Sequence, residues 1–253
     1  MKLAVQFGDL DMYSRMSMKG ALRLMQEACN CHSEQAGYGI NDIERNGVCW
    51  MLHQQRVRLY RRPCWNTQLT VQTWSRGADG LICLRDFEMT DAGGAVVAQA
   101  SSGWLLVNTA TQRLEQPSGE LLAGYGYDGR AVFEEPLRRL RALPEAKKSW
   151  EYTVLRRDID INHHVNNLCY LDYAWESLPK EYSEEDFDEA DILYKKAARL
   201  GDRLTAFSGW LPEETGDAGD GAKEENGGPT YVTAIKNETG RLLHAVVYLT
   251  RGR

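Results

Sequence analysis

A carboxylate, a carboxamide and an imidazole occupy every second position of one short segment, at Asp160, Asn162 and His164. Side chains alternate between the two faces of an extended chain, so we expect these three to point the same way, with Ile159 and Ile161 directed into the core. A carboxylate or imidazole can activate water, and an amide can orient it. The spacing therefore favours hydrolysis of an acyl compound.

A helix is expected directly after this segment, with Asn166 or Asn167 suited to cap it. Backbone N–H groups at a helix N-terminus can stabilise a developing oxyanion, and we assign that role to the groups near Val165 and Asn166. The apolar residues that follow recur at helical spacing until Pro179: Leu168, Leu171, Trp175 and Leu178.

Two other interpretations of the segment exist. Asp160 and Asn162 could simply form a turn, with His164 a surface histidine and Asn166 only a helix cap. A metal site made of Asp160, His163 and His164 is disfavoured, because on a strand His163 faces away from the other two. That arrangement leaves two ligands on one face, where three or four protein ligands are usual.

A similar sequence pattern occurs near the N-terminus, and the differences between the two copies argue for a function of the second. Residues 9–18 read Asp-Leu-Asp-Met-Tyr-Ser-Arg-Met-Ser-Met, and residues 158–167 read Asp-Ile-Asp-Ile-Asn-His-His-Val-Asn-Asn. Tyr13 and Arg15 in the first copy replace Asn162 and His164 of the second. The comparison indicates a duplicated domain in which only the second half carries out the chemistry.

The repeat extends beyond these segments. In the first half, helical spacing from Met18 to Ala36 stops at Gly37. Further echoes pair residues 60–64 with 194–198, 69–74 with 204–210, and the turn at 90–94 with the turn at 237–240. Each half thus reads as a strand, a long helix and about four antiparallel strands, in a sheet that must curl round the helix. Residues 115–149 suit a crossing linker, and residues 212–229, rich in Gly, Asp and Glu, suit a long solvated loop.

The composition is that of a globular protein of 253 residues, 43% hydrophobic and 26% charged. No apolar run approaches the ~20 residues that cross a bilayer, and the first residues lack a signal-peptide core, so we expect a cytoplasmic protein without membrane insertion. The net charge of −6 argues against nucleic-acid binding. Six scattered cysteines without a Cys-x-x-Cys pair disfavour a zinc site or a disulfide framework.

Residues 160–170 contain the pattern Asp-x-Asn-x-His-Val-Asn-Asn-x-x-Tyr, and the first half contributes further short stretches: Gln26-Glu-Ala, Gly47-Val-Cys-Trp50, Arg61-Arg-Pro63, Thr73-Trp74 and Trp104-Leu-Leu-Val107. With these motifs the chain resembles the acyl-acyl-carrier-protein thioesterases of plants and bacteria. The resemblance implies an α+β fold of two tandem hot-dog domains, each a central helix wrapped by a curled antiparallel sheet. It also implies release of free fatty acid from acyl carrier protein, with no cofactor.

The resemblance further implies a division of labour. Residues 1–122 would form an N-terminal domain that shapes the acyl pocket, 123–147 a linker, and 148–253 a catalytic domain. Asp160 and His164 would share the roles of base and nucleophile activation, and Asn162 would position the carbonyl or the water. The family usually has a glutamate where Ala197 stands, so a slow enzyme is expected unless another carboxylate replaces it.

Acyl carrier protein is acidic as a class, so the resemblance implies a basic docking site, for which we choose these residues: Arg138, Arg139, Arg141, Lys147 and Lys148. Two rival functions remain open, an acyl-CoA thioesterase and a catalytically weak acyl-binding protein, the latter suggested by Ala197. A hot-dog hydratase is disfavoured, because the proline of its Asp-x-Asn-Pro-x-His pattern is absent. Acyl chain length is undetermined, and either a monomer or a homodimer is compatible with a tandem pair.

Overall fold

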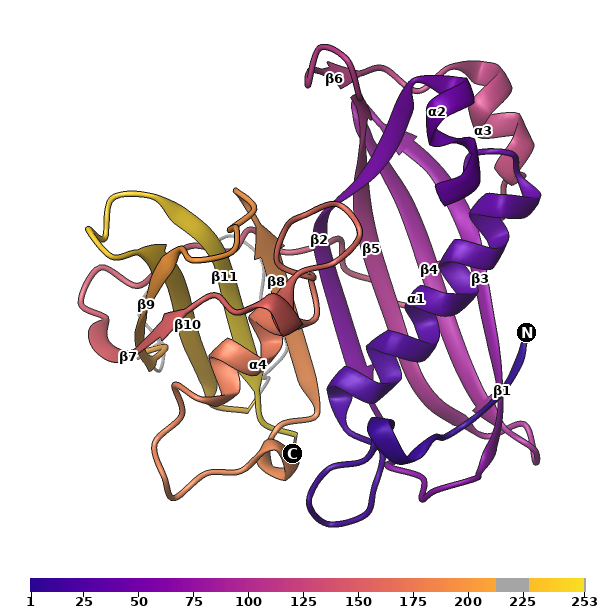
Figure 1. Ribbon diagram of the computed structural model, residues 1–253. Helices are drawn as coiled ribbons and strands as arrows, with labels where there is room; N and C mark the ends of the chain where they lie inside the picture. Colours follow the sequence, from indigo (N-terminus) through magenta and orange to yellow (C-terminus); the bar gives the residue numbers. More distant parts are fainter. Residues whose placement is uncertain (213–227, 253) are drawn as a thin grey trace, which may run out of the picture. The chain divides into compact units, whose positions relative to one another are not determined.

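The computed structural model describes residues 1–212 and 228–252, so most of the predicted loop at 212–229 lies outside the described residues (Figure 1). The chain divides into two compact units, Met1–Arg138 and Arg139–Arg253. Among the described residues, no helix combines the length and the apolar composition that crossing a membrane requires.

The first unit is an antiparallel sheet curled round one long helix (Figure 1). Its strands lie in the order β1-β3-β4-β5-β2, and helix α1 (Met18–Gln35) runs along the concave face. The strands are β1 (Lys2–Ala4), β2 (Val48–Leu59), β3 (Gln68–Asp79), β4 (Ile82–Asp91) and β5 (Val96–Asn108), with the short β6 (Leu114–Glu115) beside β5. Smaller elements complete the unit: the 3₁₀ turns η1 (Phe7–Asp9) and η2 (Ile40–Asp42), and the helices α2 (Ile43–Asn46) and α3 (Gly119–Tyr125).

Helix α1 begins and ends where its sequence pattern predicts. The hydroxyl oxygen of Ser17 accepts the N–H of Gly20 at 2.9 Å, which caps the first turn. Gly37 follows the last turn with a φ of +77°, a conformation that favours glycine. One face of the helix is buried against the sheet, through Met18, Ala21, Leu22, Met25 and Cys29. The predicted helix from Met18 to the stop at Gly37 is therefore confirmed.

The second unit repeats the order of the first. Its strands lie in the order β7-β9-β10-β11-β8, and helix α4 (Cys169–Trp175) follows the first of them in the chain. The strands are β7 (Lys147–Thr153), β8 (Glu189–Tyr194), β9 (Arg203–Trp210), β10 (Thr230–Asn237) and β11 (Leu243–Thr250), with the 3₁₀ turns η3 (Arg156–Asp158) and η4 (Glu184–Asp186). Matching β1 with β7, and β2–β5 with β8–β11, gives the same sheet order in both units. The predicted order of a strand, a helix and about four antiparallel strands is confirmed in each, but only the first unit has the long helix that was predicted.

Helix α4 is much shorter than α1 and ends before Leu178, the last residue of the predicted pattern. The N–H groups of Ser177 and Leu178 bond three residues back, to Ala174 and Trp175, so the chain leaves the helix in tighter turns. Aromatic side chains of the edge strand β7 pack against α4. The rings of Trp150 and Tyr152 stack at 5.1 Å between centroids, and Tyr152 lies 4.8 Å from Tyr173 of α4.

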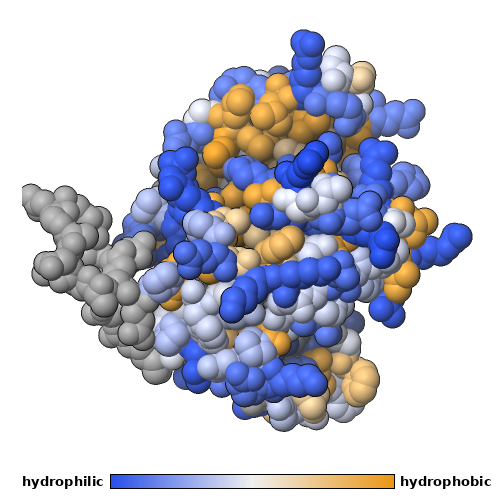
Figure 2. All heavy atoms as spheres, turned by 90° about the vertical axis from the view of Figure 1, so that its left-hand side faces the viewer, coloured by the Kyte–Doolittle hydropathy of each residue, from blue (hydrophilic) through white to orange (hydrophobic). Residues whose placement is uncertain are grey.

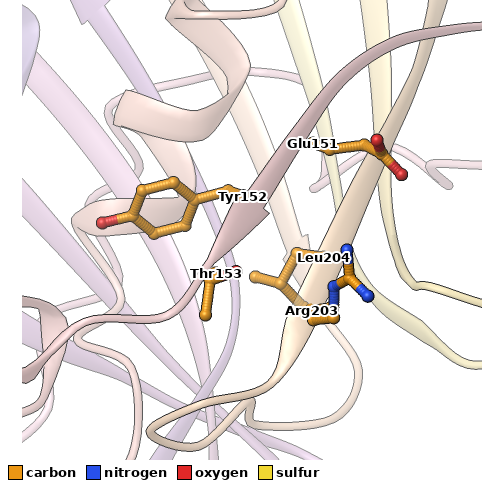
Figure 3. Close-up of a pocket in the computed structure, with 5 residues that line it drawn as sticks. All are labelled: Glu151, Tyr152, Thr153, Arg203 and Leu204. Atoms are coloured by element: carbon orange, nitrogen blue, oxygen red, sulfur yellow. The ribbon is translucent and has the colours of Figure 1, made fainter.

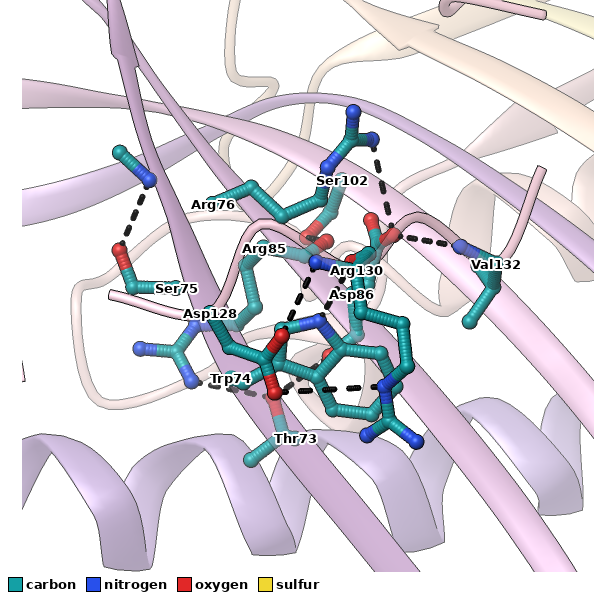
Figure 4. Close-up of polar contacts among 11 residues, drawn as sticks. Thr73, Trp74, Ser75, Arg76, Arg85, Asp86, Ser102, Asp128, Arg130 and Val132 are labelled. Carbon is teal, nitrogen blue, oxygen red and sulfur yellow. Dashed lines mark hydrogen bonds and ion pairs between the residues drawn. The ribbon is translucent and has the colours of Figure 1, made fainter. Parts of the chain in front are cut away.

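The predicted linker 123–147 is not a free connection, because its residues pack on the sheets. Asp128, Arg130 and Val132 lie beside Trp74 of β3 and Asp86 of β4 (Figure 4). The Trp74 indole N–H donates to the Arg130 carbonyl at 2.8 Å, and the Arg130 guanidinium lies 3.9 Å from the centre of the Trp74 ring. The Val132 N–H donates to the buried Asp86 carboxylate at 2.9 Å. In the second unit, Leu140 is buried against the sheet, and Tyr248 bonds the backbone of Arg141.

Candidate active site

Asp160, Asn162 and His164 lie on a tight turn whose hydrogen bonds are repeated in the first unit. The Asp160 N–H donates to the His164 carbonyl at 2.9 Å, as the Asp11 N–H donates to the Arg15 carbonyl at 2.7 Å. His163 and Ser14 occupy the same position in their turns, and both have positive φ, of 59° and 64°. The duplication inferred from the sequence thus extends to single hydrogen bonds.

The aspartate, and not the other two polar residues, determines this turn. Oδ1 of Asp160 accepts the Asn162 N–H at 2.8 Å, and Oδ1 of Asp11 accepts the Tyr13 N–H at 2.9 Å. Such aspartate turns depend on the carboxylate oxygen and not on the residues it encloses. Because the first unit forms the same turn with Tyr13 and Arg15, the fold does not require Asn162 or His164. Their polar side chains need another explanation.

The expectation that residues 159–164 form an extended segment is wrong. Ile159 pairs with Val165 across the turn, and Ile161 is 67% exposed instead of entering the core. The three polar side chains therefore do not share a strand face. They are carried together by one turn, with Asp160 and His164 half-buried and Asn162 exposed.

The predicted oxyanion donors are also wrong, because both are already bonded within the protein. The Val165 N–H donates to the Ala198 carbonyl at 2.9 Å, and the Asn166 N–H donates to the Asp158 carbonyl at 2.7 Å. Helix α4 begins only at Cys169. The carboxamide oxygen of Asn166 accepts the Leu168 N–H at 2.9 Å, and this bond lies before the helix. In the described part of the chain, the Asn167 N–H has no acceptor.

The loop that contains Ala197 supports the turn from the other side. The neighbouring Ala198 accepts the Val165 N–H, and its own N–H donates to the Tyr170 hydroxyl at 3.1 Å. Burial raises the pKa of Tyr170 to about 12, so this hydroxyl is neutral and can accept. Ala197 itself is exposed.

The hydrogen bonds of this loop show that the predicted alignment of residues 60–64 with residues 194–198 is shifted by one residue. The Tyr60 N–H donates to the Val97 carbonyl, and the corresponding donor to the His244 carbonyl is Lys195, not Tyr194. Met16 of the first turn bonds the carbonyl of Pro63, as Val165 bonds that of Ala198. Ala197 therefore corresponds to Arg62.

The predicted docking residues are divided between the units. Arg138 belongs to the first unit, and Gln54 bonds its carbonyl at 2.7 Å. The other four belong to the second unit and are exposed: Arg139, Arg141, Lys147 and Lys148. Lys148 forms an ion pair with Glu151 at 2.7 Å.

A small pocket lies between β7 and β9 and is lined by Glu151, Tyr152, Thr153, Arg203 and Leu204 (Figure 3). None of the predicted catalytic residues lines it. The site predicted from the sequence does not include Asp158, a buried carboxylate two residues before Asp160. The signal was present, because Asp158 and Asp9 hold the same place in the repeated pattern.

Two antiparallel sheets of one topology, each curled round a single helix, define a tandem hot-dog protein, as the sequence predicts. The fold is shared with an acyl-ACP thioesterase from Bacteroides thetaiotaomicron, at a TM-score of 0.81 and 21% identity, covering 99% of this chain and 96% of that one. The 12:0-ACP thioesterase from Umbellularia californica gives a TM-score of 0.79 at 20% identity, covering 99% and 92%.

Residues 1–125 match the family model of the acyl-ACP thioesterase N-terminal domain, and residues 142–245 match that of the C-terminal domain. The chain belongs to the acyl-ACP thioesterase family. The chloroplastic oleoyl-acyl carrier protein thioesterase 1 of Arabidopsis thaliana is 25% identical over 225 residues, which cover 80% of this chain. The chloroplastic dodecanoyl-[acyl-carrier-protein] hydrolase of Umbellularia californica is 26% identical over 181 residues, or 66% of this chain. The matches span only 62% and 47% of these plant proteins.

Proposed function

We propose that this protein hydrolyses acyl-acyl carrier protein to free fatty acid and holo-acyl carrier protein. One observation carries the proposal. The two turns have the same hydrogen bonds, and they differ at the two positions whose side chains the turn does not need. The second turn has Asn162 and His164 where the first has Tyr13 and Arg15. The names of the plant relatives, thioesterases and hydrolases of acyl carrier protein substrates, agree with it.

In the proposed reaction Asp160 and His164 share the task of activating water, and Asn162 orients the water or the thioester carbonyl. The N–H of Asn167 is the candidate donor to the oxyanion, since those of Val165 and Asn166 are occupied. Ala197 supplies no carboxylate beside this turn. A missing general base costs ~10²–10⁴ in rate, so we expect a slow enzyme.

We assign the acyl pocket to the first unit, in keeping with a catalytic C-terminal domain from about residue 148. In the second unit, aromatic rings of β7 pack against α4. At one end of the first unit, where β2 begins and β6 lies, hydrophobic side chains reach the surface (Figure 2). Met51 of β2 and Leu114 of β6 are 42% and 47% exposed.

The proposal is tested by single-turnover release of fatty acid from a panel of acyl carrier proteins loaded with chains of different length. The same chains carried by coenzyme A form the comparison. We expect release from the carrier protein to be faster. Faster release from coenzyme A would identify an acyl-CoA thioesterase. Binding of acyl carrier protein without release above background would identify the acyl-binding protein that Ala197 suggests.

Reversing the charge of Arg139 and Arg141 together is expected to raise the KM for acyl carrier protein substrates roughly tenfold, with kcat within twofold. The two arginines are exposed on one short segment and would meet an acidic partner. The measurement is steady-state kinetics at low and high salt, because screening should shrink the difference.

The control for this docking prediction is Lys180→Glu, an exposed charge reversal in the same unit that follows α4. A small thioester that lacks the carrier protein should be hydrolysed equally by all three proteins. An unchanged KM in the double variant Arg139→Glu/Arg141→Glu would place the docking site elsewhere.

A cytoplasmic location is also a proposal. All six cysteines are free, as is usual in a reducing compartment. The plant relatives are named as chloroplastic, so fractionation of cells that make the tagged protein is the direct test. Light scattering of the purified chain would distinguish a monomer from a homodimer.

A further inference from the structure

A buried carboxylate connects the two ends of the turn that carries Asp160, Asn162 and His164. Asp158 is only 6% exposed. Its Oδ2 accepts the Leu155 N–H and the Tyr152 hydroxyl, both at 2.7 Å. Its carbonyl accepts the Asn166 N–H from the far side of the turn at 2.7 Å. A displacement of Asp158 would therefore move both flanks of the turn.

Asp9 holds the same place in the first unit, with the same backbone bonds. Its Oδ2 accepts the Gln6 N–H at 2.9 Å, and its carbonyl accepts the Ser17 N–H at 2.8 Å. Here, however, the charge is neutralised by an arginine of α1. Arg23 donates from Nε to one oxygen of Asp9 and from its terminal nitrogen to the other, the latter at 2.7 Å.

Among the described residues of the second unit, no arginine of the helix takes this place. Arg23 stands fourteen residues after Asp9, and the same step from Asp158 leads to Asp172, an acid. The nearest cation is Arg157, whose Nε is 3.9 Å from Oδ1 and whose side chain is 76% exposed, so water weakens its contribution. The hydroxyl of Tyr152 is therefore the main side-chain donor to this buried carboxylate. A hydrogen bond to a buried charge is among the stronger ones in proteins.

Packing fixes Tyr152 for this contact. Its ring packs against those of Trp150 and Tyr173, at 5.1 and 4.8 Å between centroids. The side chain extends from β7 away from the carboxylate of Glu151 and from Arg203 (Figure 3). The neighbouring Tyr173 hydroxyl is buried and bonds no group among the described residues. Burial and the charge of Asp158 raise the pKa of Tyr173, which keeps that hydroxyl neutral.

We propose that Tyr152 and Asp158 act as a positioning pair, which holds the turn of Asp160, Asn162 and His164 in its reactive geometry. The pair does not touch the substrate and acts only through the turn, so the inference rests on the proposed thioesterase function. The first unit uses an ion pair for the corresponding turn, which has no catalytic side chains. In the second unit the Tyr152 hydroxyl takes the place of the arginine as the main side-chain donor, and the exposed Arg157 at 3.9 Å is the weaker contact.

The test is Tyr152→Phe, which removes one hydroxyl and leaves the stacked ring in place. We expect kcat for acyl carrier protein substrates to fall about tenfold with KM within twofold, because small displacements of reacting groups slow the chemical step. Hydrogen exchange of the amides at 160–166 should become about tenfold faster, while exchange at 11–17 stays unchanged. A second variant, Asp158→Asn, should lower kcat as well, and the double variant should lose no more than Asp158→Asn alone.

Arg23→Met is the matched control, because it breaks the corresponding contact in the first unit. It should lower the melting temperature at least as much as Tyr152→Phe, yet leave kcat per folded molecule within twofold. A Tyr152→Phe protein with unchanged kcat and unchanged exchange at 160–166 would overturn the positioning pair. A wild-type protein that releases no fatty acid would overturn the proposed function, and the exchange measurement would still decide whether the pair holds the turn.

Discussion

The Asp160→Asn variant is expected to retain its fold, and its rate of acyl-acyl carrier protein hydrolysis is expected to fall by a factor of ~10²–10⁴. Oδ1 of Asp160 accepts the Asn162 N–H at 2.8 Å, and an asparagine carbonyl oxygen can accept the same bond. The turn should therefore survive, while the carboxylate proposed to activate water is replaced. Single-turnover release of fatty acid measures the loss, and the melting temperature checks the fold.

The chain contains its own control for this substitution. Asp11 accepts the Tyr13 N–H at 2.9 Å in a turn of the same geometry, so Asp11→Asn makes the same chemical change in the first unit. We expect Asp11→Asn to keep wild-type turnover. If Asp160→Asn retained more than a tenth of the wild-type rate, Asp160 would be a turn-forming residue only, and the catalytic assignment would be wrong.

The largest expected effect on stability belongs to Gly20→Ala, which should destabilise the protein by about 3 kcal/mol. A Cβ at residue 20 would overlap the carbonyl oxygen of Asp9 and lie 2.8 Å from the Asp9 Cβ. That carbonyl also accepts the N–H of Ser17, the residue that caps α1, so it cannot move without breaking the cap. Urea unfolding, followed by circular dichroism, gives the change in unfolding free energy.

Gly119→Ala is the control for this prediction, since it also places a methyl group in the first turn of a helix. No heavy atom lies within 4 Å of a Cβ at residue 119. Alanine there should change stability by less than ~1 kcal/mol, in the stabilising direction. Equal effects at the two glycines would mean that helix propensity, and not the contact with Asp9, decides the outcome.

The repeated architecture could be predicted because it depends on local patterns. Helical spacing predicted α1 and its end at Gly37, and glycine-containing turns predicted the β4–β5 and β10–β11 hairpins. The ends of helix α4 were harder to predict. The N–H groups in its first and last turns donate to the carbonyl three residues earlier instead of four. The packing of residues 123–147 on the sheets could not be predicted, for a different reason. These residues pack through contacts such as Trp74 with Arg130, 56 residues apart in the chain, which no local pattern records.

The segment around Asp160 shows the same limit. Its residue types predict the candidate site, but the alternating pattern does not distinguish a strand from an aspartate turn, which also places polar residues at every second position. The donors at Val165 and Asn166 were wrong since the partner of Val165 is Ala198, which comes from a distant loop. Tertiary hydrogen bonds therefore decided which N–H groups stay free, and the sequence carries no direct record of them.

The different lengths of the two central helices bear on how the chain folds. Isolated helices shorter than ~12–15 residues are marginal in water, and helicity increases with length. The 18 residues of α1 can therefore form before their sheet, but the seven of α4 cannot. In the second unit, helix and sheet must appear together, through contacts between residues far apart in sequence, and such contacts slow folding. The unit that carries Asp160 should thus be the later to fold, and the first unit has the head start of earlier synthesis.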